Sequence, residues 1–536
     1  KAGTGKSTFL RYVCEHTKKK HVVLAPTGIA AINAGGSTMH SFFKLPFYPL
    51  LPDDPNLSLQ RGRIHEFFKY TKPHRKLLEQ IELVIIDEIS MVRADLIDAI
   101  DRILRVYSHN LREPFGGKQL LLVGDVFQLE PVVKNDEREI LNRAYPTPYF
   151  FSARVFSQID LVSIELQKVY RQTDSVFVSV LDHIRTNTAG AADLQLLNTR
   201  YGSHIEESEA DMYITLATRR DTVDSINEKK LAELAGEPIT FEGSIEGDFP
   251  ESSLPTSQEL VLKPGAQIIF IKNDFDRRWV NGTIGVIAGI DEEEETIYVI
   301  TDDGKECDVK RESWRNIRYR YNEKTKEIEE EVLGSFTQYP IRLAWAITVH
   351  KSQGLTFSRV VIDFTGGVFA GGQAYVALSR CTSLDGIQLK KPINRADIFV
   401  RPEIVNFAGR FNDRQAIDKA LKQAQADVQY AAAARAFDKG DMEECLEQFF
   451  RAIHSRYDIE KPVPRRLIRR KLGIINTLQE QNKKLKEQMR EQQERLRQYA
   501  HEYLLMGNEC ITQAHDARAA IANYDKALSL DPNYID

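Results

Sequence analysis

Gly3-Thr4-Gly5-Lys6-Ser7-Thr8 stands near the beginning of this 536-residue sequence and decides the fold of the region around it. Gly5, Lys6 and Ser7 fit the end of the phosphate-loop pattern G-x-x-x-x-G-K-[ST], whose first glycine would come just before the sequence begins. The backbone N–H groups of such a loop can surround an anion because its glycines allow unusual backbone angles. The alternative is a chance glycine turn before a helix. An amphipathic helix to about Thr17 is expected after the loop, as the pattern requires.

Short apolar runs that end in polar residues recur in the first part of the chain. They are His21–Ala25, Leu83–Ile86, which leads into Asp87-Glu88, and Gln119–Val123, which leads into Gly124-Asp125. Helical stretches separate them, and this pattern predicts a parallel sheet covered on both faces. Ligands of such sheets bind at the carboxyl ends of the strands, where these polar residues lie.

A second α/β unit is expected from about Phe151, with strands at Met212–Ala217 and Val360–Asp363. Between these strands, residues 262–333 alternate apolar and polar, which predicts a small inserted antiparallel β-barrel. Its turns are expected at Asn281-Gly282 and Asp303-Gly304, and a solvated hairpin end at Asp291–Glu295. The strand signals stop near Val400, and residues 401–536 are expected to be all-helical.

Composition excludes several classes of protein. The net charge of −5 argues neither for nor against a nucleic-acid partner, because basic residues can be concentrated in one groove. The five cysteines are scattered, which argues against zinc ribbons and fits an intracellular compartment. That compartment would be cytoplasm or nucleoid in a bacterium, and nucleus or mitochondrion in a eukaryote. The given residues include no apolar run that could span a bilayer and no signal-peptide pattern, so neither is expected within them.

The loop and the strand ends together predict ATP chemistry. Lys6 would neutralise the β- and γ-phosphates, and Ser7 would bind Mg²⁺. Asp87 would also hold Mg²⁺, directly or through water, while Glu88 would orient and deprotonate the attacking water. An acidic pair after a strand is often only a solvated loop, but here a phosphate loop precedes it in the chain.

Three further residues are candidates for this chemistry. Gln128 could reach the γ-phosphate and report its loss. Arg171 and Arg380, in the second α/β unit, could stabilise the charge that develops on the γ-phosphate. Surface salt bridges are the default for isolated arginines, so the argument for these two depends on their motif context. Arginines from a second domain would make hydrolysis depend on domain closure.

The motifs accumulate into a pattern that resembles the petite-integration-frequency (Pif) helicases of superfamily 1B, relatives of the RecD-like helicases. The resemblance covers about residues 1–400, with the segments in the family's order. They are Ala2–Thr8, Ala25–Ala31, Gly36–Phe43, Asp87–Val92, Pro114–Gly117, Gly124–Leu129, Tyr170–Gln172, Leu343–Thr356 and Tyr375–Arg380. One departure is Leu129-Glu130-Pro131, where the family usually has Leu-Pro-Pro, and the family's adenine-reading segment lies outside this sequence.

The resemblance implies two RecA-like P-loop domains with ATP between them and single-stranded DNA across the top of both. Domain 1A would be residues 1–150 with a duplex-splitting wedge at about 43–73, domain 2A would be 151–261 and 334–400, and a Src-homology-type barrel 2B would be 262–333. The nucleotide-binding residues would be Gly3, Thr4, Gly5, Lys6, Ser7, Thr8, Gln353 and Gly354.

The activity implied by the resemblance is 5′ to 3′ translocation with unwinding of duplex or forked DNA, RNA–DNA hybrids or G-quadruplexes, in DNA repair, recombination, replication or telomere maintenance. The expected DNA contacts are Thr38, His40, Ser41 and Phe42 on one loop and Thr348, His350 and Lys351 on the matching loop. A non-specific strand binder needs such backbone contacts and aromatic faces. Lone histidines are more often buried and merely hydrogen-bonded, but both loops face the groove in this family.

The C-terminal part carries two weaker patterns. Ala520, Tyr524, Ala527 and Asp531-Pro532 fit a tetratricopeptide repeat, and Ala433, Phe449 and Ala452 fit an earlier one less well. Residues 475–499 have heptad spacing, which indicates either a coiled coil or one long amphipathic helix packed on its neighbours. We therefore expect self-association or a protein partner there.

Two functions from other classes compete with the DNA helicase. One is an ATPase that remodels RNA or protein–RNA complexes, which strand displacement on DNA and RNA substrates would separate from it. The other is a scaffold whose helices recruit partners while the ATPase gates assembly. The presence of Lys6, Asp87, Glu88 and Arg380 argues against an inactive motor.

Overall fold

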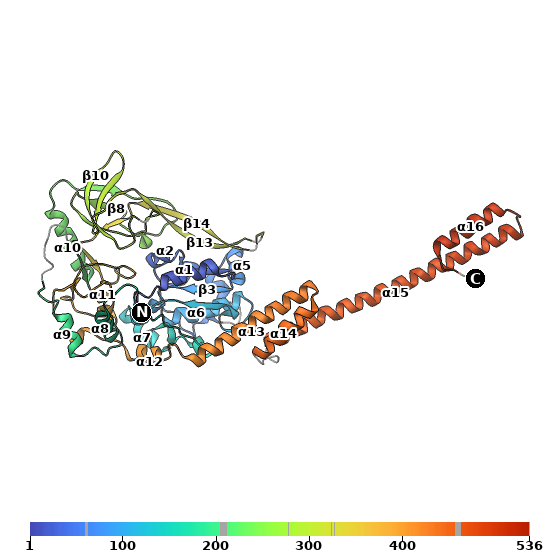
Figure 1. Cartoon of the computed structure of the whole chain (residues 1–536), viewed down its shortest axis with the longest axis horizontal. Helices are drawn as coiled ribbons and strands as arrows, with labels where there is room; N and C mark the ends of the chain where they lie inside the picture. Colours follow the sequence, from blue (N-terminus) through green and yellow to red (C-terminus); the bar gives the residue numbers. More distant parts are fainter. Residues whose placement is uncertain are drawn as a thin grey trace. The chain divides into compact units, whose positions relative to one another are not determined.

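A computed structural model describes residues 1–58, 63–203, 212–276, 278–322, 324–325, 327–455 and 462–534, without the side chains of residues 252 and 462–467. The chain forms two compact units, Lys1–Asp413 and Arg414–Asp536 (Figure 1). Across the described ranges, no helix combines the length and apolar character that a membrane crossing needs.

The first α/β region is built on a parallel sheet. Its strands, in spatial order, are β2 (Ser37–Thr38), β1 (His21–Ala25), β3 (Leu83–Ile86) and β4 (Gln119–Leu122). The three predicted strands are confirmed. The helices here are α1 (Lys6–His16), α2 (Gly28–Ala34), α3 (Met39–Phe43), α4 (Arg63–Phe68), α5 (Lys72–Gln80), α6 (Ala94–Tyr107) and α7 (Asn135–Asn142). The side chains of β3 are all buried, as its unbroken apolar sequence predicts for a strand covered on both faces.

A second parallel sheet lies beyond the first in the chain. Its spatial order is β16 (Ala346–Thr348), β5 (Ile214–Ala217), β17 (Val360–Asp363) and β18 (Ile387–Leu389). Its helices are α8 (Ser175–Arg185), α9 (Ala191–Asn198), α10 (Arg220–Glu233), α11 (Gln373–Leu378) and α12 (Pro402–Ala408). Short 3-10 helices lie at Pro55–Leu57, Ile89–Met91, Pro114–Gly117, Phe150–Ser152, Arg154–Ser157, Glu251–Ser253 and Arg395–Asp397. The mixed α/β fold with parallel sheets is therefore confirmed.

An antiparallel region interrupts the second sheet in sequence. Five strands pair in the order β12 (Glu306–Val309), β11 (Thr296–Thr301), β10 (Ile284–Asp291), β9 (Gln267–Phe270) and β15 (Ile341–Leu343). Gly282 and Gly304 have φ of 103° and 78° at the two predicted turns, a conformation that favours glycine. The sheet includes β15, which lies beyond residue 333, the end that the alternation suggested.

A long hairpin follows β12 in the chain and belongs to a different sheet. Strands β13 (Glu312–Asn322) and β14 (Glu327–Gln338) pair with each other, and β14 also pairs with β7 (Ser244–Gly247), while β6 (Ile239–Glu242) pairs with β8 (Glu259–Leu262). The Tyr319 hydroxyl accepts the Val23 N–H at 3.3 Å, so the hairpin packs on the first α/β region. Strands β13 and β14 thus belong to a sheet separate from the five-stranded one, whereas the alternation predicted a single small barrel over residues 262–333.

The second unit is helical where it is described. Helices α13 (Arg414–Lys439) and α14 (Met442–Ser455) form one hairpin, and α15 (Pro462–Thr512) and α16 (Ala517–Leu530) form another (Figure 1). The prediction of helices after Val400 is confirmed. The 51 residues of α15 form one continuous helix, and from Leu472 to Tyr499 none of its described side chains is buried.

Candidate functional site

The glycine loop before α1 is shaped to receive an anion. Gly5 is the N-cap of α1 with φ 82° and ψ 23°, and nothing lies within 4 Å of where its Cβ would be. Gly3 has φ 68°, and a Cβ there would lie 2.6 Å from the Cβ of Arg171. The loop is therefore open at Gly5, while Gly3 touches the segment that begins the second α/β region. Only glycine satisfies both the backbone angles and this close approach.

Lys6 is held at the base of the loop. Its ammonium donates a hydrogen bond to the Lys1 carbonyl at 2.7 Å. Burial lowers the pKa of Lys6, and Asp125 and Glu88 oppose that shift. The side chains of Ser7 and Thr8, which come next in the first turn of α1, are exposed.

Asp87 and Glu88 follow β3 at its carboxyl end. Asp87 Oδ1 accepts the Glu88 N–H at 2.9 Å, and Glu88 has a left-handed backbone with φ 48°. Glu88 Oε2 is buried without a hydrogen-bond partner among the described residues. Burial, helped by the charge of Asp87, raises the pKa of Glu88 to about 7, although Lys6 and Arg380 pull it down. A carboxyl group with such a pKa can accept a proton near neutral pH.

Arg380 is a buried cation without a counter-ion. Its side chain, 2% exposed, donates to the Val376 carbonyl at 3.0 Å and to Ser379 Oγ at 3.1 Å. Among the described residues, no carboxylate lies within ion-pair distance of its guanidinium. Burial and the neighbouring charge of Arg171 lower the pKa of Arg380 to about 9. An isolated buried charge is costly, so this geometry favours an anion at the site.

Arg171 completes the cationic group. It donates to the Ser379 carbonyl at 3.0 Å, and burial lowers its pKa. Its charge and that of Arg380 both influence Lys6, so the three predicted cations are close together. They come from two different α/β regions, which meet at this point.

Other contacts join the two regions beside these cations. Gln353 Nε2 lies 3.5 Å from Gln128 Oε1, which brings two predicted residues together, and Gly354 has φ 79° with open space around it. A Cβ at Gly372 would lie 2.4 Å from the Gln128 carbonyl oxygen, so the start of α11 packs directly on that loop. The Tyr375 hydroxyl donates to Asp125 at 3.2 Å. The sequence pattern did not identify this tyrosine as a contact between the two regions.

Two turns share one hydrogen-bond pattern: the first turn of helix α3, which follows β2, and the loop that follows β16. The Ser41 N–H donates to Thr38 Oγ1 at 3.1 Å, and the Lys351 N–H donates to Thr348 Oγ1 at 3.2 Å. In each loop a histidine immediately precedes the residue that donates, and burial lowers the pKa of both His40 and His350. The six predicted polar residues of the two loops therefore form two matching turns.

Each histidine stacks on an exposed phenylalanine that the sequence pattern did not identify. His40 stacks on Phe47, with ring centroids 5.0 Å apart and planes 11° apart. His350 stacks on Phe369, with ring centroids 6.4 Å apart and ring planes 19° apart. Phe47 is 82% exposed and Phe369 is 62% exposed, so both offer an open aromatic face. No local sequence signal singles them out, because only the fold brings each ring to its histidine.

Phe42 requires a correction. It was predicted to contact DNA, but its side chain is 3% exposed. Its ring packs against Phe43 and against Tyr319 of the β13–β14 hairpin, with centroids 4.8 and 6.1 Å away. A ring enclosed in this way has no face left for a base, so Phe42 belongs to the hydrophobic core.

Comparison with known proteins identifies the family of the chain. The family model described as PIF1-like helicase matches residues 1–189. The ATP-dependent DNA helicase Pif1 of Campylobacter jejuni is 33% identical over 405 residues, which cover 72% of this chain and 87% of the relative. The crystal structure of Bacteroides sp. Pif1 in complex with ADP-AlF4 superposes with a TM-score of 0.70 and 41% sequence identity. The match covers 76% of this chain and 91% of the Bacteroides chain. Bacteroides Pif1 bound to single-stranded DNA is 40% identical, with a TM-score of 0.55, over 78% and 93% of the two chains. This chain belongs to the PIF1-like helicase family.

Proposed function

We propose that the chain is an ATP-dependent DNA helicase that moves 5′ to 3′ along single-stranded DNA. The observation that carries the proposal is Arg380, a buried cation from the second α/β region. Its charge acts on Lys6 of the phosphate loop, and it has no carboxylate partner among the described residues. An ATP site that needs both regions couples hydrolysis to their relative movement, which is what a motor requires.

The loop residues fit a nucleotide triphosphate. The positive φ of Gly3 and Gly5 turns backbone N–H groups inward, and the start of α1 adds the favourable end of a helix dipole. Lys6 supplies a positive charge next to this concave backbone. Thr4, Ser7 and Thr8 complete the loop, and Gln353 and Gly354 approach from the second region.

The oxygen atoms of Asp87 and Ser7 are suitable ligands for Mg²⁺. Asp87 accepts one hydrogen bond through Oδ1, and the Ser7 side chain is exposed at the start of α1. Within the described ranges, no three His, Cys, Asp or Glu side chains are grouped to hold a metal alone. That suits Mg²⁺, which proteins usually bind with one or two carboxylates together with substrate phosphates. When bound by Ser7 and Asp87, it would neutralise phosphate charge.

Hydrolysis is assigned to Glu88 and the two arginines. Glu88 orients the attacking water and takes its proton as the oxygen bonds to the γ-phosphorus and the bond to the β-phosphate oxygen breaks. Its raised pKa makes it a stronger base than an ordinary carboxylate. Arg380 and Arg171 stabilise the negative charge that builds up on the γ-phosphoryl oxygens. Gln128, which touches Gln353, reports loss of the γ-phosphate to the second region.

The two matching turns are proposed as the track for the DNA strand. Thr38, His40 and Ser41 would hold it on the first region, and Thr348, His350 and Lys351 on the second. Exposed Phe47 and Phe369 add stacking faces, which bind every base alike. Burial lowers the pKa of Lys351, and the charges of Arg342 and Arg220 lower it further against the opposing effect of Asp224. Cations therefore lie beside this turn, as binding of a phosphate backbone requires.

Finer features of the family extend the proposal. The five-stranded sheet would act as the 2B barrel, residues 43–58 and 63–73 as parts of the wedge, and the two helical hairpins as tetratricopeptide-like modules. Residues 59–62 of the wedge lie outside the described part of the chain. The substrates would be duplex and forked DNA, RNA–DNA hybrids or G-quadruplexes in genome maintenance inside the cell.

Directional unwinding tests the proposal. Duplexes with a 5′ or a 3′ single-stranded tail are incubated with the protein, ATP and Mg²⁺, and strand release is followed by fluorescence. We expect release from the 5′-tailed duplex only, and none without ATP. A tail of RNA replaces DNA in a parallel series. Preferential release with the RNA tail would favour the RNA-remodelling alternative, and ATP hydrolysis without any strand release would contradict a helicase.

A further inference from the structure

The middle of α15 has exposed side chains along its length within the second unit. At one end Lys471 forms an ion pair with Asp438 and lies 4.6 Å from the Phe437 ring centroid. At the other end Ala500 is fully buried where α16 packs on α15. Between them, from Leu472 to Tyr499, none of the described side chains is buried. Helices in proteins gain most of their stability from packing an amphipathic face, and this stretch makes no such packing among the described residues of the unit.

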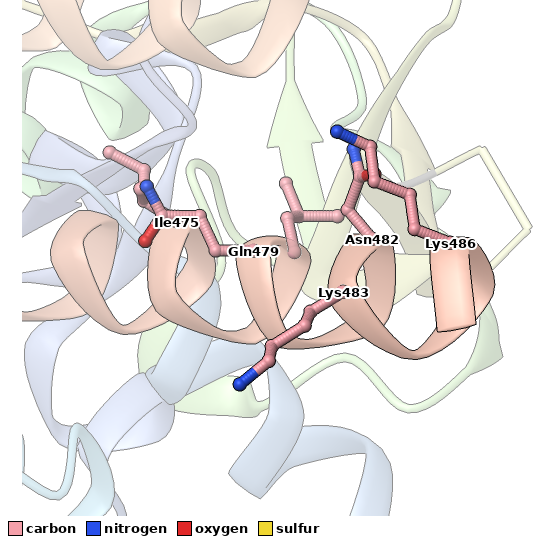
Figure 2. A pocket seen from close by; sticks show the side chains of 6 residues that line it. Ile475, Gln479, Asn482, Lys483 and Lys486 are labelled. Atoms are coloured by element: carbon pink, nitrogen blue, oxygen red, sulfur yellow. The ribbon is translucent and has the colours of Figure 1, made fainter. Parts of the chain in front are cut away.

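This exposed segment is also the segment with a heptad repeat. Ile475, Asn482, Met489 and Leu496 occupy a positions, and Leu478, Leu485, Gln492 and Tyr499 occupy d positions. Leu478, Leu485, Met489 and Tyr499 are each more than half exposed. Figure 2 shows the first part of this segment, where Ile475 and Asn482 lie on successive turns of one helix. Together with Leu478, Gln479, Lys483 and Lys486 they line a pocket.

We propose that residues 475–499 of α15 form a parallel, in-register two-stranded coiled coil with a second copy of this chain. The two amide side chains in the seam select the partner. An apolar helix would leave the side-chain amides of Asn482 and Gln492 buried without hydrogen-bond partners, which is unfavourable. A second copy offers an amide opposite each of them. An Asn at an a position is a known means of fixing a paired, in-register dimer.

Charge selects the parallel orientation. The four acidic residues of the segment, Glu480, Glu487, Glu491 and Glu494, all lie at c or f positions, away from the seam. Two cations flank the seam, Lys486 at e and Arg495 at g. In a parallel pair, Lys486 faces Gln481 of the second copy. The e position that corresponds to Arg495 is Ala500, an uncharged residue already covered where α16 packs on α15, so no like charges meet.

An antiparallel pair also satisfies the seam amides, because Asn482 would face Gln492 of the second copy. However, its e positions face each other, so Lys486 would lie opposite its own twin. Like charges at these flanking positions disfavour a pairing. The parallel arrangement is therefore the one that satisfies both the amides and the charges.

The first experiment measures the molar mass of the full chain by light scattering over a series of concentrations. We expect twice the mass of one chain. The double variant Leu478→Lys and Leu485→Lys should return it to one chain, because two charges enter the seam. The matched control is Thr477→Lys with Gln498→Lys, which adds the same charge at c positions and should remain a dimer. Far-UV circular dichroism and ATP hydrolysis show that each variant is folded.

The second experiment tests the register. Asn482→Cys should form a disulfide between two chains under mild oxidation, whereas Glu487→Cys, at an f position, should give no more than the parent chain with its own five cysteines. A single-chain mass at every concentration overturns the dimer. A dimer that survives the seam lysines places the interface elsewhere and also overturns it. A dimer without the Asn482→Cys crosslink overturns the parallel register. None of these outcomes depends on helicase activity.

Discussion

Glu130 accepts hydrogen bonds from the guanidinium of Arg401, from Nε at 2.7 Å and from Nη2 at 3.3 Å. The Tyr149 hydroxyl donates to the same carboxylate at 2.8 Å. Glu130 follows the Gln128 loop at the end of β4, and Arg401 immediately precedes α12, so the pair ties two segments that are far apart in sequence. From the sequence, Glu130 is notable only as a residue that stands where the family usually has proline. In the structure, Glu130 forms an ion pair with Arg401.

We expect Glu130→Gln and Arg401→Gln each to lower the thermal unfolding midpoint. The double variant should lower it by less than the sum of the two single decreases. The coupling should be about 1 kcal/mol or less, because Arg401 is partly exposed and solvent screens the pair. Arg401 and Tyr149 lower the pKa of Glu130 against the opposing effect of burial. The pair therefore stabilises the fold above the ordinary pKa of 4.5, and this stability is lost as the pH falls through the lower folded pKa.

The pH dependence supplies the control. The difference in midpoint between the parent and Glu130→Gln should be constant above about pH 5 and should shrink in more acidic buffer, since glutamine does not titrate. Equal shifts at all pH values would show that the variant acts through packing and not through the ion pair.

Lys6→Ala should abolish ATP hydrolysis and unwinding, because Lys6 is the cation at the base of the phosphate loop. The measurement is phosphate release with saturating single-stranded DNA. Lys18→Ala, a change of an exposed lysine just after α1, is the matched control and should keep the parent rate. Turnover near the parent rate in Lys6→Ala would contradict the assignment of this loop.

Glu88→Gln should bind ATP but hydrolyse it about 10²–10⁴-fold more slowly, as expected for loss of a general base. Because the base acts when deprotonated and its pKa is about 7, kcat/KM of the parent should rise with pH through that value. The same rise should be missing in Glu88→Gln. Failure to bind a fluorescent ATP analogue would instead give Glu88 a structural role.

Arg380→Ala and Arg171→Ala should each lower kcat far more than they weaken ATP binding. Cations on a transferring phosphoryl group contribute mainly in the transition state, and such arginines are worth about 10³-fold or more in kcat. Arg380→Lys keeps the charge but not the planar guanidinium, and it should recover only part of the rate. Equal losses in affinity and in turnover would indicate a role in the bound ground state.

The sequence predicts what is encoded locally. The buried strand Leu83–Ile86 and the acidic pair after it are adjacent in the chain, so their pattern is enough to place Asp87 and Glu88. Strands β13 and β14 alternate like any exposed strand pair, and the local sequence does not encode that they form a separate sheet packed on the first α/β region, where Tyr319 meets Val23. In the same way, the turn at Thr38 is predictable, but the side of the loop that Phe42 occupies depends on the hairpin packed against it.

The aromatic residues give the sharpest test of the proposed DNA track. Phe47→Ala and Phe369→Ala should each weaken single-stranded DNA binding by about 1–3 kcal/mol, the usual contribution of one stacked base. Basal ATP hydrolysis should survive, because neither ring touches the phosphate loop residues. Binding is measured by fluorescence anisotropy at a fixed salt concentration, since phosphate contacts make affinity depend on salt.

Phe42→Ala is the contrasting variant. A buried phenylalanine replaced by alanine typically costs about 3–5 kcal/mol, so this change should lower the unfolding midpoint sharply. Phe42→Leu, which keeps most of the apolar volume, should restore stability and also DNA affinity, although leucine has no aromatic face. That rescue distinguishes packing from stacking: if Phe42→Leu is stable yet binds DNA as weakly as Phe369→Ala, then Phe42 contacts DNA after all. If Phe47→Ala and Phe369→Ala bind DNA as the parent does, the strand does not follow the two histidine turns.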